Sequence, residues 1–189
     1  MAINLTKGQT VSLTKSGGGS LTSVNLVLSW EGLSKKGLFG GSKKISVDLD
    51  ASCLIFDGSR NLIDQVWFKQ LASKDGAVQH TGDDRTGGGG ETIRVNLGSL
   101  SPTAQSLVFT VNSFLGQAFT QIENATVQLF DASTNSEVAS YTLAGSGSHT
   151  ALVMAKVARS GGAWTITAIG APAQGRTFHE ILPAVSAAL

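Results

Sequence analysis

The sequence predicts an all-β fold, a two-sheet antiparallel β-sandwich with a short C-terminal helix, in a single domain that spans residues 1–189. Three observations carry this prediction. Apolar residues recur at every second position in short runs, turn-forming Gly, Ser, Asn and Asp bound those runs, and helical periodicity is nearly absent before the end of the chain. Short strands at such spacing are typical of a sandwich or barrel.

Two segments near the start show the alternation most clearly. One face of the first predicted strand carries Val24, Leu26, Leu28 and Trp30, which are core candidates. In the second predicted strand the apolar face carries Val47, Leu49, Ala51, Cys53 and Ile55. The opposite face of that strand carries Ser46, Asp48, Asp50 and Ser52. The second strand therefore presents acidic side chains on a face of their own.

The later elements follow the same pattern until the C-terminus. Further strands are expected at Val66–Phe68, Thr92–Leu97, Leu107–Val111, Ala125–Phe130, Val138–Leu143, Ala151–Ala158 and Trp164–Gly170. Thr177 followed by Glu180 matches a capping box at a helix start. The apolar positions of the expected helix are Phe178, Ile181, Leu182 and Val185, and Pro183 is expected to kink the helix or end it early.

Composition restricts the class of protein. The chain has 189 residues, 41% of them hydrophobic and 14% charged, which describes a compact soluble protein. A net charge of +1 gives no field that would attract nucleic acid. The single cysteine, Cys53, excludes an intramolecular disulfide and favours a reducing compartment. Neither a signal core nor an apolar run long enough for a transmembrane segment is present, so we expect a cytoplasmic protein.

The segment from Lys35 to Lys44 combines turn-forming glycines with paired lysines, and Leu38 and Phe39 lie at its tip. Two interpretations fit it. A plain hairpin with solvated lysines is the simpler one, and a docking loop for a partner or an anionic membrane surface is the alternative.

The segment from His80 to Glu91 mixes acids with glycines, which let a backbone turn tightly and aim its carbonyls inward. Calcium takes six to eight oxygen ligands in a flexible shell, so it suits this mixture. Asp48 and Asp50 project from one strand face and complete such a shell in this interpretation. The spacing differs from that of an EF-hand, and acids in a glycine-rich loop are also common in ordinary solvated turns.

Catalytic machinery is not visible in the sequence, so we expect no enzyme. The glycine run ends in Gly90-Glu91 rather than in the Gly-Lys-Ser/Thr of a phosphate-binding loop, and no Gly-x-Ser-x-Gly motif occurs. The three histidines, His80, His149 and His179, lie far apart along the chain. An oxyanion-handling or redox enzyme that uses Cys53 as a thiolate is one competing hypothesis, but Cys53 lies on the presumed core face, where a thiol is inert.

Several motifs resemble those of the TerD family of tellurium-resistance and stress-response proteins. The strand with Asp48 and Asp50, followed by Lys74-Asp75-Gly76 and His80-Thr81-Gly82-Asp83, is similar to the family signature. Further segments resemble the TerZ-like branch in particular, namely Val66–Leu71, Phe109–Phe114, Gly116-Gln117, Glu123–Ala125, Gly147–Thr150 and Gly175–Thr177. The resemblance runs from Leu5 to about Val185.

The resemblance implies a sandwich that holds Ca²⁺ at one end, in a cytoplasmic protein associated with other Ter-system proteins, including at the membrane surface. It implies no particular oligomeric state. The acidic ligand positions correspond to Asp48, Asp50, Asp83 and Glu91, and Asp84 stands where the family has Asn. The resemblance does not fix the carbonyl ligands; from their position in the loop we expect those of Gly82, Thr86 and Gly88.

The chain departs from the family pattern at Gly87 to Gly90, which replace most of the acids of the loop. Fewer carboxylates mean fewer ions or weaker binding. An interaction module that has lost the metal is therefore the alternative function.

Overall fold

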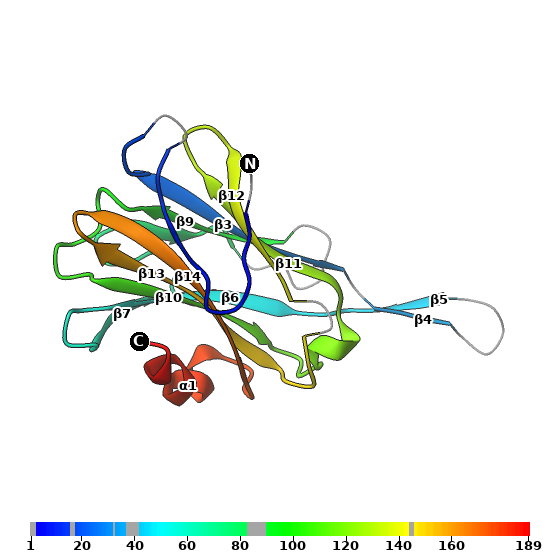
Figure 1. Ribbon diagram of the computed structural model, residues 1–189. Helices are drawn as coiled ribbons and strands as arrows, with labels where there is room; N and C mark the ends of the chain where they lie inside the picture. The colour runs from blue at the N-terminus through cyan, green and yellow to red at the C-terminus, as the bar shows by residue number, and fades with distance from the viewer. Residues whose placement is uncertain (1–2, 16–17, 32, 37–41, 83–89, 144–145) are drawn as a thin grey trace.

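Two six-stranded sheets pack face to face, and one short helix lies against the outer face of one of them (Figure 1). The computed structural model describes residues 3–15, 18–31, 33–36, 42–82, 90–143 and 146–189. Within these residues the strands of the two sheets pair antiparallel, apart from β1 and β12, which pair in parallel. The predicted sandwich with a C-terminal helix is confirmed.

The first sheet has the order β1-β12-β11-β3-β9-β8. Its strands are β1 (Ile3–Asn4), β12 (Ser136–Thr142), β11 (Glu123–Asp131), β3 (Ser23–Glu31), β9 (Glu91–Asn96) and β8 (Val78–His80). The second sheet has the order β2-β14-β13-β10-β6-β7. Its strands are β2 (Thr10–Ser12), β14 (Ala163–Ala173), β13 (Ala151–Ser160), β10 (Ser106–Ser113), β6 (Leu49–Phe56) and β7 (Leu62–Val66).

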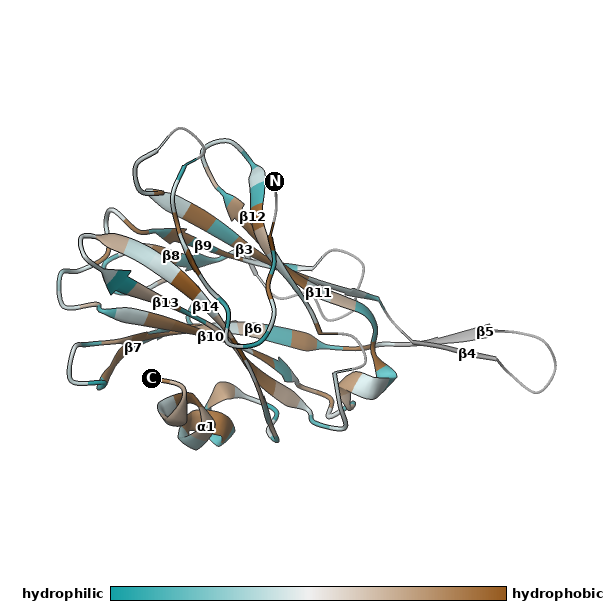
Figure 2. Ribbon diagram, in the orientation of Figure 1, coloured by the Kyte–Doolittle hydropathy of each residue, from teal (hydrophilic) through white to brown (hydrophobic). Residues whose placement is uncertain are grey.

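The main core lies between the two sheets. In β3 buried and half-buried residues alternate, and the predicted core residues of this strand are all buried, namely Val24, Leu26, Leu28 and Trp30. Figure 2 shows hydrophobic residues along the strands of both sheets and on the C-terminal helix. The period-two prediction for this strand is therefore confirmed.

Strand β6 is buried on both of its faces. The predicted inner-face residues lie in the core between the sheets, and they are Val47, Leu49, Ala51, Cys53 and Ile55. Leu54 and Phe56 point to the outer face, where they pack with the C-terminal segment in a second apolar cluster. A strand enclosed in this way fixes the backbone on which Asp48 and Asp50 lie.

The C-terminal segment forms a 3₁₀-helix, Phe178–Ile181, followed by α1 (Leu182–Ala187). Two details of the prediction were wrong. The capping box does not form, because the Glu180 carboxylate accepts a hydrogen bond from Arg176 N (3.2 Å) rather than from the Thr177 amide. Pro183 lies in the first turn of α1, where its missing N–H costs no hydrogen bond, so it begins the helix instead of ending it.

The predicted strand Val66–Phe68 is also wrong beyond its first residue. Strand β7 ends at Val66, and the next residues form a tight turn in which Trp67 and Gln70 exchange two backbone hydrogen bonds of 3.0 Å. Aromatic residues favour strands, but here they occupy a turn, because their side chains pack against other rings.

A separate hairpin projects from one end of the sandwich (Figure 1). Its strands are β4 (Leu33–Lys36) and β5 (Ser42–Ile45), which pair with the register Leu33↔Ile45. The hairpin predicted for the lysine-rich segment is thus confirmed, while its tip, with Leu38 and Phe39, lies outside the described residues.

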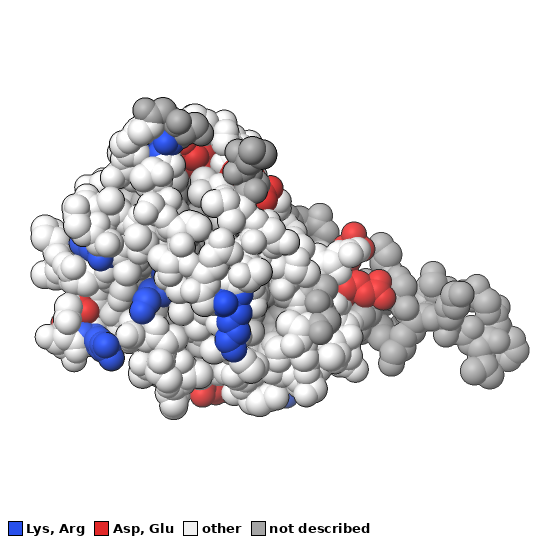
Figure 3. Space-filling model, viewed as in Figure 1, with Lys and Arg blue, Asp and Glu red and all other residues white. Residues whose placement is uncertain are grey.

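No helix in the described ranges is long and apolar enough to cross a membrane. On the face seen in Figure 3, the Lys and Arg side chains of the described residues lie scattered among uncharged ones.

Candidate metal centre

Three buried acids lie at the end of the sandwich from which the β4–β5 hairpin projects (Figure 1). Asp48 directly precedes β6, Asp50 is the second residue of β6, and Glu91 is the first residue of β9. Their exposed fractions are 7%, 5% and 0%. Burial of this degree is rare for carboxylates, because the charged form loses its hydration, so these side chains need compensating interactions.

The Glu91 carboxylate joins the two sheets. Its Oε2 atom accepts a hydrogen bond of 2.7 Å from the amide of Ala51, the residue after Asp50. Strand β7 ends opposite Cys53, so among the described residues no strand pairs with β6 on this side at Ala51. Glu91 thereby supplies the acceptor for an amide that the sheet leaves open, and its carboxylate comes to lie beside the acidic strand.

One oxygen of Glu91 remains without a hydrogen bond. Oε1 is buried and accepts none from any residue that the structure describes. An orphaned carboxylate oxygen in the interior is costly, since it has lost water without a replacement. This oxygen is therefore the clearest indication of a ligand at this end of the molecule.

The ring of His80 makes a second hydrogen bond with the Glu91 carboxylate. Its Nε2 lies 3.2 Å from Glu91 Oε2, and its Nδ1 accepts a hydrogen bond of 3.1 Å from Gly82 N. An accepting Nδ1 carries no proton, so the ring is neutral and Nε2 donates to the carboxylate. The charge of Glu91 is thus stabilised by donors but is not cancelled by a cation among these contacts.

The backbone of the acidic strand is fixed at its start. Trp30 Nε1 donates to the carbonyl of Val47 at 2.7 Å, and the carbonyl of Asp48 accepts from Phe114 N at 3.0 Å. Because both bonds hold carbonyls that flank the acids, they limit how far Asp48 can move.

The entry to β9 depends on a glycine. Gly90 has φ +84°, and a Cβ at this position would overlap the carbonyl oxygen of Leu28, the residue that pairs with Glu91 in β3. A side chain is excluded here by the neighbouring strand, so glycine is required for Glu91 to enter the sandwich.

The predicted ligands divide into two groups. Asp48, Asp50, Glu91 and Gly82 are described, and the first three share one end of the sandwich. The other four predicted ligands lie outside the described residues, namely Asp83, Asp84, Thr86 and Gly88. Over the described ranges, no three His, Cys, Asp or Glu side chains form a group that could hold a metal ion. The described side chains alone therefore do not make a complete site.

His80 was not predicted to take part in this site. The strand Val78–His80 buries its first and last residues and exposes the one between, so Val78 and His80 share the inner face. The same period of two was present in the sequence, but three residues are too few to identify a strand.

Cys53 lies in the core between the sheets and is fully buried. Burial raises the pKa of its thiol far above the ordinary value, and the nearby charge of Asp64 raises it further. A thiol in this setting stays protonated, which argues against its use as a thiolate nucleophile.

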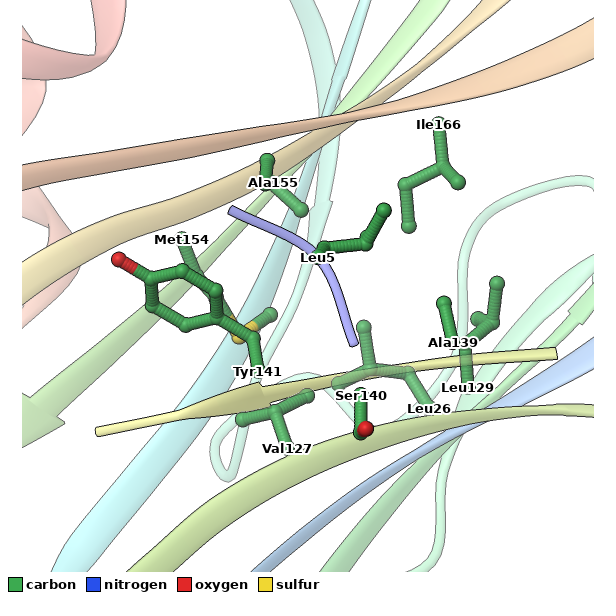
Figure 4. A pocket seen from close by; sticks show the side chains of 11 residues that line it. Leu5, Leu26, Val127, Leu129, Ala139, Ser140, Tyr141, Met154, Ala155 and Ile166 are labelled. Carbon is green, nitrogen blue, oxygen red and sulfur yellow. The ribbon is translucent and has the colours of Figure 1, made fainter. Parts of the chain in front are cut away.

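Of the cavities lined by described residues, three lie away from the acidic end. The most apolar, of about 20 Å³, opens between the sheets and is lined by Leu5, Tyr141 and Met154 among others (Figure 4). A more open one of about 390 Å³ is lined by Asp64, Lys74 and Asp75, and a third, of about 450 Å³, lies beside β2 and β12. The first has room for little more than one water molecule.

Comparisons with known proteins agree on one family. The sequence profile of the TerD domain matches residues 1–182. The tellurium resistance protein TerZ of Serratia marcescens is 42% identical over 95% of this chain and 94% of its own length. The stress response protein SCP2 of Bacillus subtilis (strain 168) is 34% identical over 96% of this chain and 98% of its own length.

Two crystal structures show the same fold. A homologue of telluride resistance protein (TerD) from Streptomyces coelicolor A3(2) has a TM-score of 0.69 at 19% identity, over 82% of this chain and 92% of that chain. A protein of unknown function has a TM-score of 0.70 at 20% identity, over 86% of this chain and 96% of that chain.

Proposed function

The chain belongs to the TerD family of tellurium-resistance and stress-response proteins, and from this premise we propose that it is a calcium-binding module that acts by assembly with partner proteins rather than by catalysis. In this proposal it works in the cytoplasm, and its partners are other proteins of the Ter system, including at the membrane surface.

The observation that carries the calcium proposal is the orphaned oxygen of Glu91. Oε1 is buried at the same end as the carboxylates of Asp48 and Asp50, and all of these are hard oxygen donors. Calcium binds carboxylate and carbonyl oxygens in shells of six to eight, so the donor chemistry fits. Asp83 and Asp84 with the carbonyls of Gly82, Thr86 and Gly88 complete the proposed ligand set.

Each residue of the proposed site has its own role. Bound Ca²⁺ would supply positive charge against the buried carboxylates. Glu91 ties that end of β9 to β6 through the Ala51 amide, and His80 orients Glu91 by donating to Oε2. Because Glu91 follows directly on the loop that carries the remaining predicted ligands, filling the site would order the surface on which a partner docks.

Calcium titration by calorimetry on chelator-stripped protein tests this proposal. Saturable binding is expected for the native chain and is expected to be lost in Glu91→Gln, which keeps the shape of the side chain but removes its charge. Glu123→Gln is the matched control, because Glu123 is an exposed acid at the same end of the sandwich. Magnesium is expected to bind more weakly, since it demands a stricter octahedral shell. Equal calcium binding by native protein and Glu91→Gln would exclude the site.

A calcium-independent interaction module is the second candidate, favoured by the projecting β4–β5 hairpin (Figure 1). In that case calcium leaves the melting temperature unchanged, and capture of a partner depends on the hairpin tip with Leu38 and Phe39. The two candidates are separated by the same titration, followed by substitution of both tip residues with serine.

A further inference from the structure

Exposed apolar side chains are concentrated in two turns at the acidic end. Among the described residues five large apolar side chains are exposed, and three of them belong to these turns or directly follow them, namely Leu71 (48%), Phe114 (39%) and Leu115 (52%). Contiguous exposed apolar groups mark interaction sites, whereas isolated ones need no explanation. Trp67, Phe68, Leu71, Phe114 and Leu115 are called the apolar turn surface below.

Both turns are held rigidly by the backbone. In the first, Trp67 and Gln70 exchange two hydrogen bonds of 3.0 Å, which leaves Phe68 and Lys69 at the tip. In the second, which follows β10, Gly116 N donates to Ser113 O at 3.0 Å and Phe114 and Leu115 form the tip. The exposed apolar residues therefore lie at or beside the tips of two tight turns.

Ring contacts join the two turns into one surface. The rings of Phe68 and Phe114 meet edge to face with centroids 5.8 Å apart. Trp67 contacts Phe68 at 4.7 Å and packs at 5.2 Å against Phe178 of the C-terminal segment. The base of the surface is thus anchored in the fold, while its outer residues remain exposed.

Cationic groups flank this surface. Lys69 Nζ lies 5.3 Å from the ring centroid of Trp67 and 5.5 Å from that of Phe68. On the other side, Arg176 Nε lies 3.9 Å from the position that a Cβ on Gly116 would take, next to Leu115. In a bilayer that contains anionic lipids, the acyl chains lie directly beneath negatively charged headgroups. Apolar tips with adjacent positive charges are complementary to that arrangement.

We propose that the apolar turn surface docks on an anionic phospholipid bilayer. Phe114 and Leu115 enter the acyl boundary, aromatic rings occupy the headgroup level, and Lys69 and Arg176 contact the lipid phosphates and carboxylates. The flanking positive charges favour an anionic surface as the partner, and the three cavities described above involve none of the residues of the apolar turn surface. The inference goes beyond the proposed function, because these contacts need no bound calcium.

Vesicle sedimentation with the full chain tests the proposal. The probes are vesicles of phosphatidylcholine alone and of equal parts phosphatidylcholine and phosphatidylserine, each in calcium and in chelator. The mixed vesicles are expected to retain the protein, and the double variant Phe114→Ser, Leu115→Ser should weaken retention by about tenfold or more. The double variant Lys69→Gln, Arg176→Gln should abolish the preference for phosphatidylserine.

Leu62→Ser is the matched control, because Leu62 is 37% exposed and lies at the other end of β7 from Trp67. It is expected to leave retention unchanged. If the double variant at the tips does not fold, Leu115→Ser alone replaces it, since half of that side chain is already exposed.

The inference would be overturned by no retention on the mixed vesicles, by retention in calcium but not in chelator, or by equal retention of the native chain and the tip variant. A dimer in gel filtration that the tip variant abolishes, without vesicle binding, would assign the surface to a second copy and also overturn it. Calcium calorimetry reports on the proposed function separately. A chain that binds calcium but no vesicles refutes only this inference, and one that binds vesicles but no calcium refutes only the metal site.

Discussion

Replacing Gly90 with alanine tests how the loop delivers Glu91 into the sandwich. Gly90 has φ +84°, and a Cβ would overlap the carbonyl oxygen of Leu28 and lie 3.3 Å from its carbon. The neighbour is backbone and not a flexible side chain. Leu28 also pairs with Glu91, so it cannot move away without opening the first pair of the β3–β9 ladder.

The expected loss of stability has two parts. A non-glycine residue at positive φ costs about 1–2 kcal/mol. Displacing Glu91 from the Ala51 amide removes a hydrogen bond to a charged acceptor, which contributes about 1.5–3 kcal/mol. Gly90→Ala should therefore lower the free energy of unfolding by about 2.5–5 kcal/mol, and it should weaken calcium binding because the Glu91 carboxylate moves.

Urea denaturation of Gly90→Ala and Gly162→Ala makes the measurement specific. Gly162 has nearly the same φ, +82°, but a Cβ there would meet nothing within 4 Å. Its substitution is expected to cost only the backbone strain, about 1–2 kcal/mol. Equal losses in the two variants would refute the argument, because they would mean that the contact with Leu28 does not restrict this position.

Two further predictions concern groups away from the metal centre. Cys53 should not react with thiol reagents in the native chain and should react fully once urea unfolds it, because burial raises its pKa and blocks access; rapid native labelling would contradict this. Burial alone would raise the pKa of Asp75, but hydrogen bonds from Ser73 Oγ and from the amides of Ser101 and Ala77 outweigh it and lower the pKa from 3.8. The ionised form therefore stabilises the fold above that value, and the stabilisation is lost as the pH falls through the lowered pKa. Asp75→Asn should accordingly destabilise the protein more at neutral pH than in acid, as urea denaturation at both would measure, and equal losses would contradict the assignment.

The inner faces of the sandwich could be predicted from the sequence because a strand has only two sides. In β3 and β6, one side is apolar at every second position, and that side lies in the core. The burial of the outer side of β6 could not be predicted in this way. Leu54 and Phe56 are covered by Phe178 and Val185, which lie more than a hundred positions later in the chain, and no local period reports such a contact.

The errors arose where a local preference competed with packing. Trp67 and Phe68 have side chains typical of strands, yet the turn they form is stabilised by contacts with Phe178 and Phe114. Pro183 was expected to kink or end a helix that starts after Thr177, where the sequence predicted a capping box. The box does not form and α1 begins at Leu182, so Pro183 lies in the first turn of α1, where proline is tolerated.

The candidate site was predicted by residue type more than by geometry. Asp48, Asp50 and Glu91 were identified as acids in a suitable pattern, and they do share one end of the molecule. The bond from Ala51 N to Glu91 and the contact with His80 depend on how two sheets meet. Such contacts between distant segments leave no periodic signal in the sequence.

The glycine run has a second explanation besides the loss of ligands. The resemblance to the family leads us to expect acids where this chain has glycines up to Gly90, which by itself would indicate weaker or fewer metal sites. Gly90, however, is adjacent to the backbone of Leu28, and no acidic side chain could be accommodated there without moving β3. At this position glycine is required by packing, and its effect is to place Glu91 inside the sandwich. The final glycine of the run therefore supports the proposed metal centre instead of counting against it.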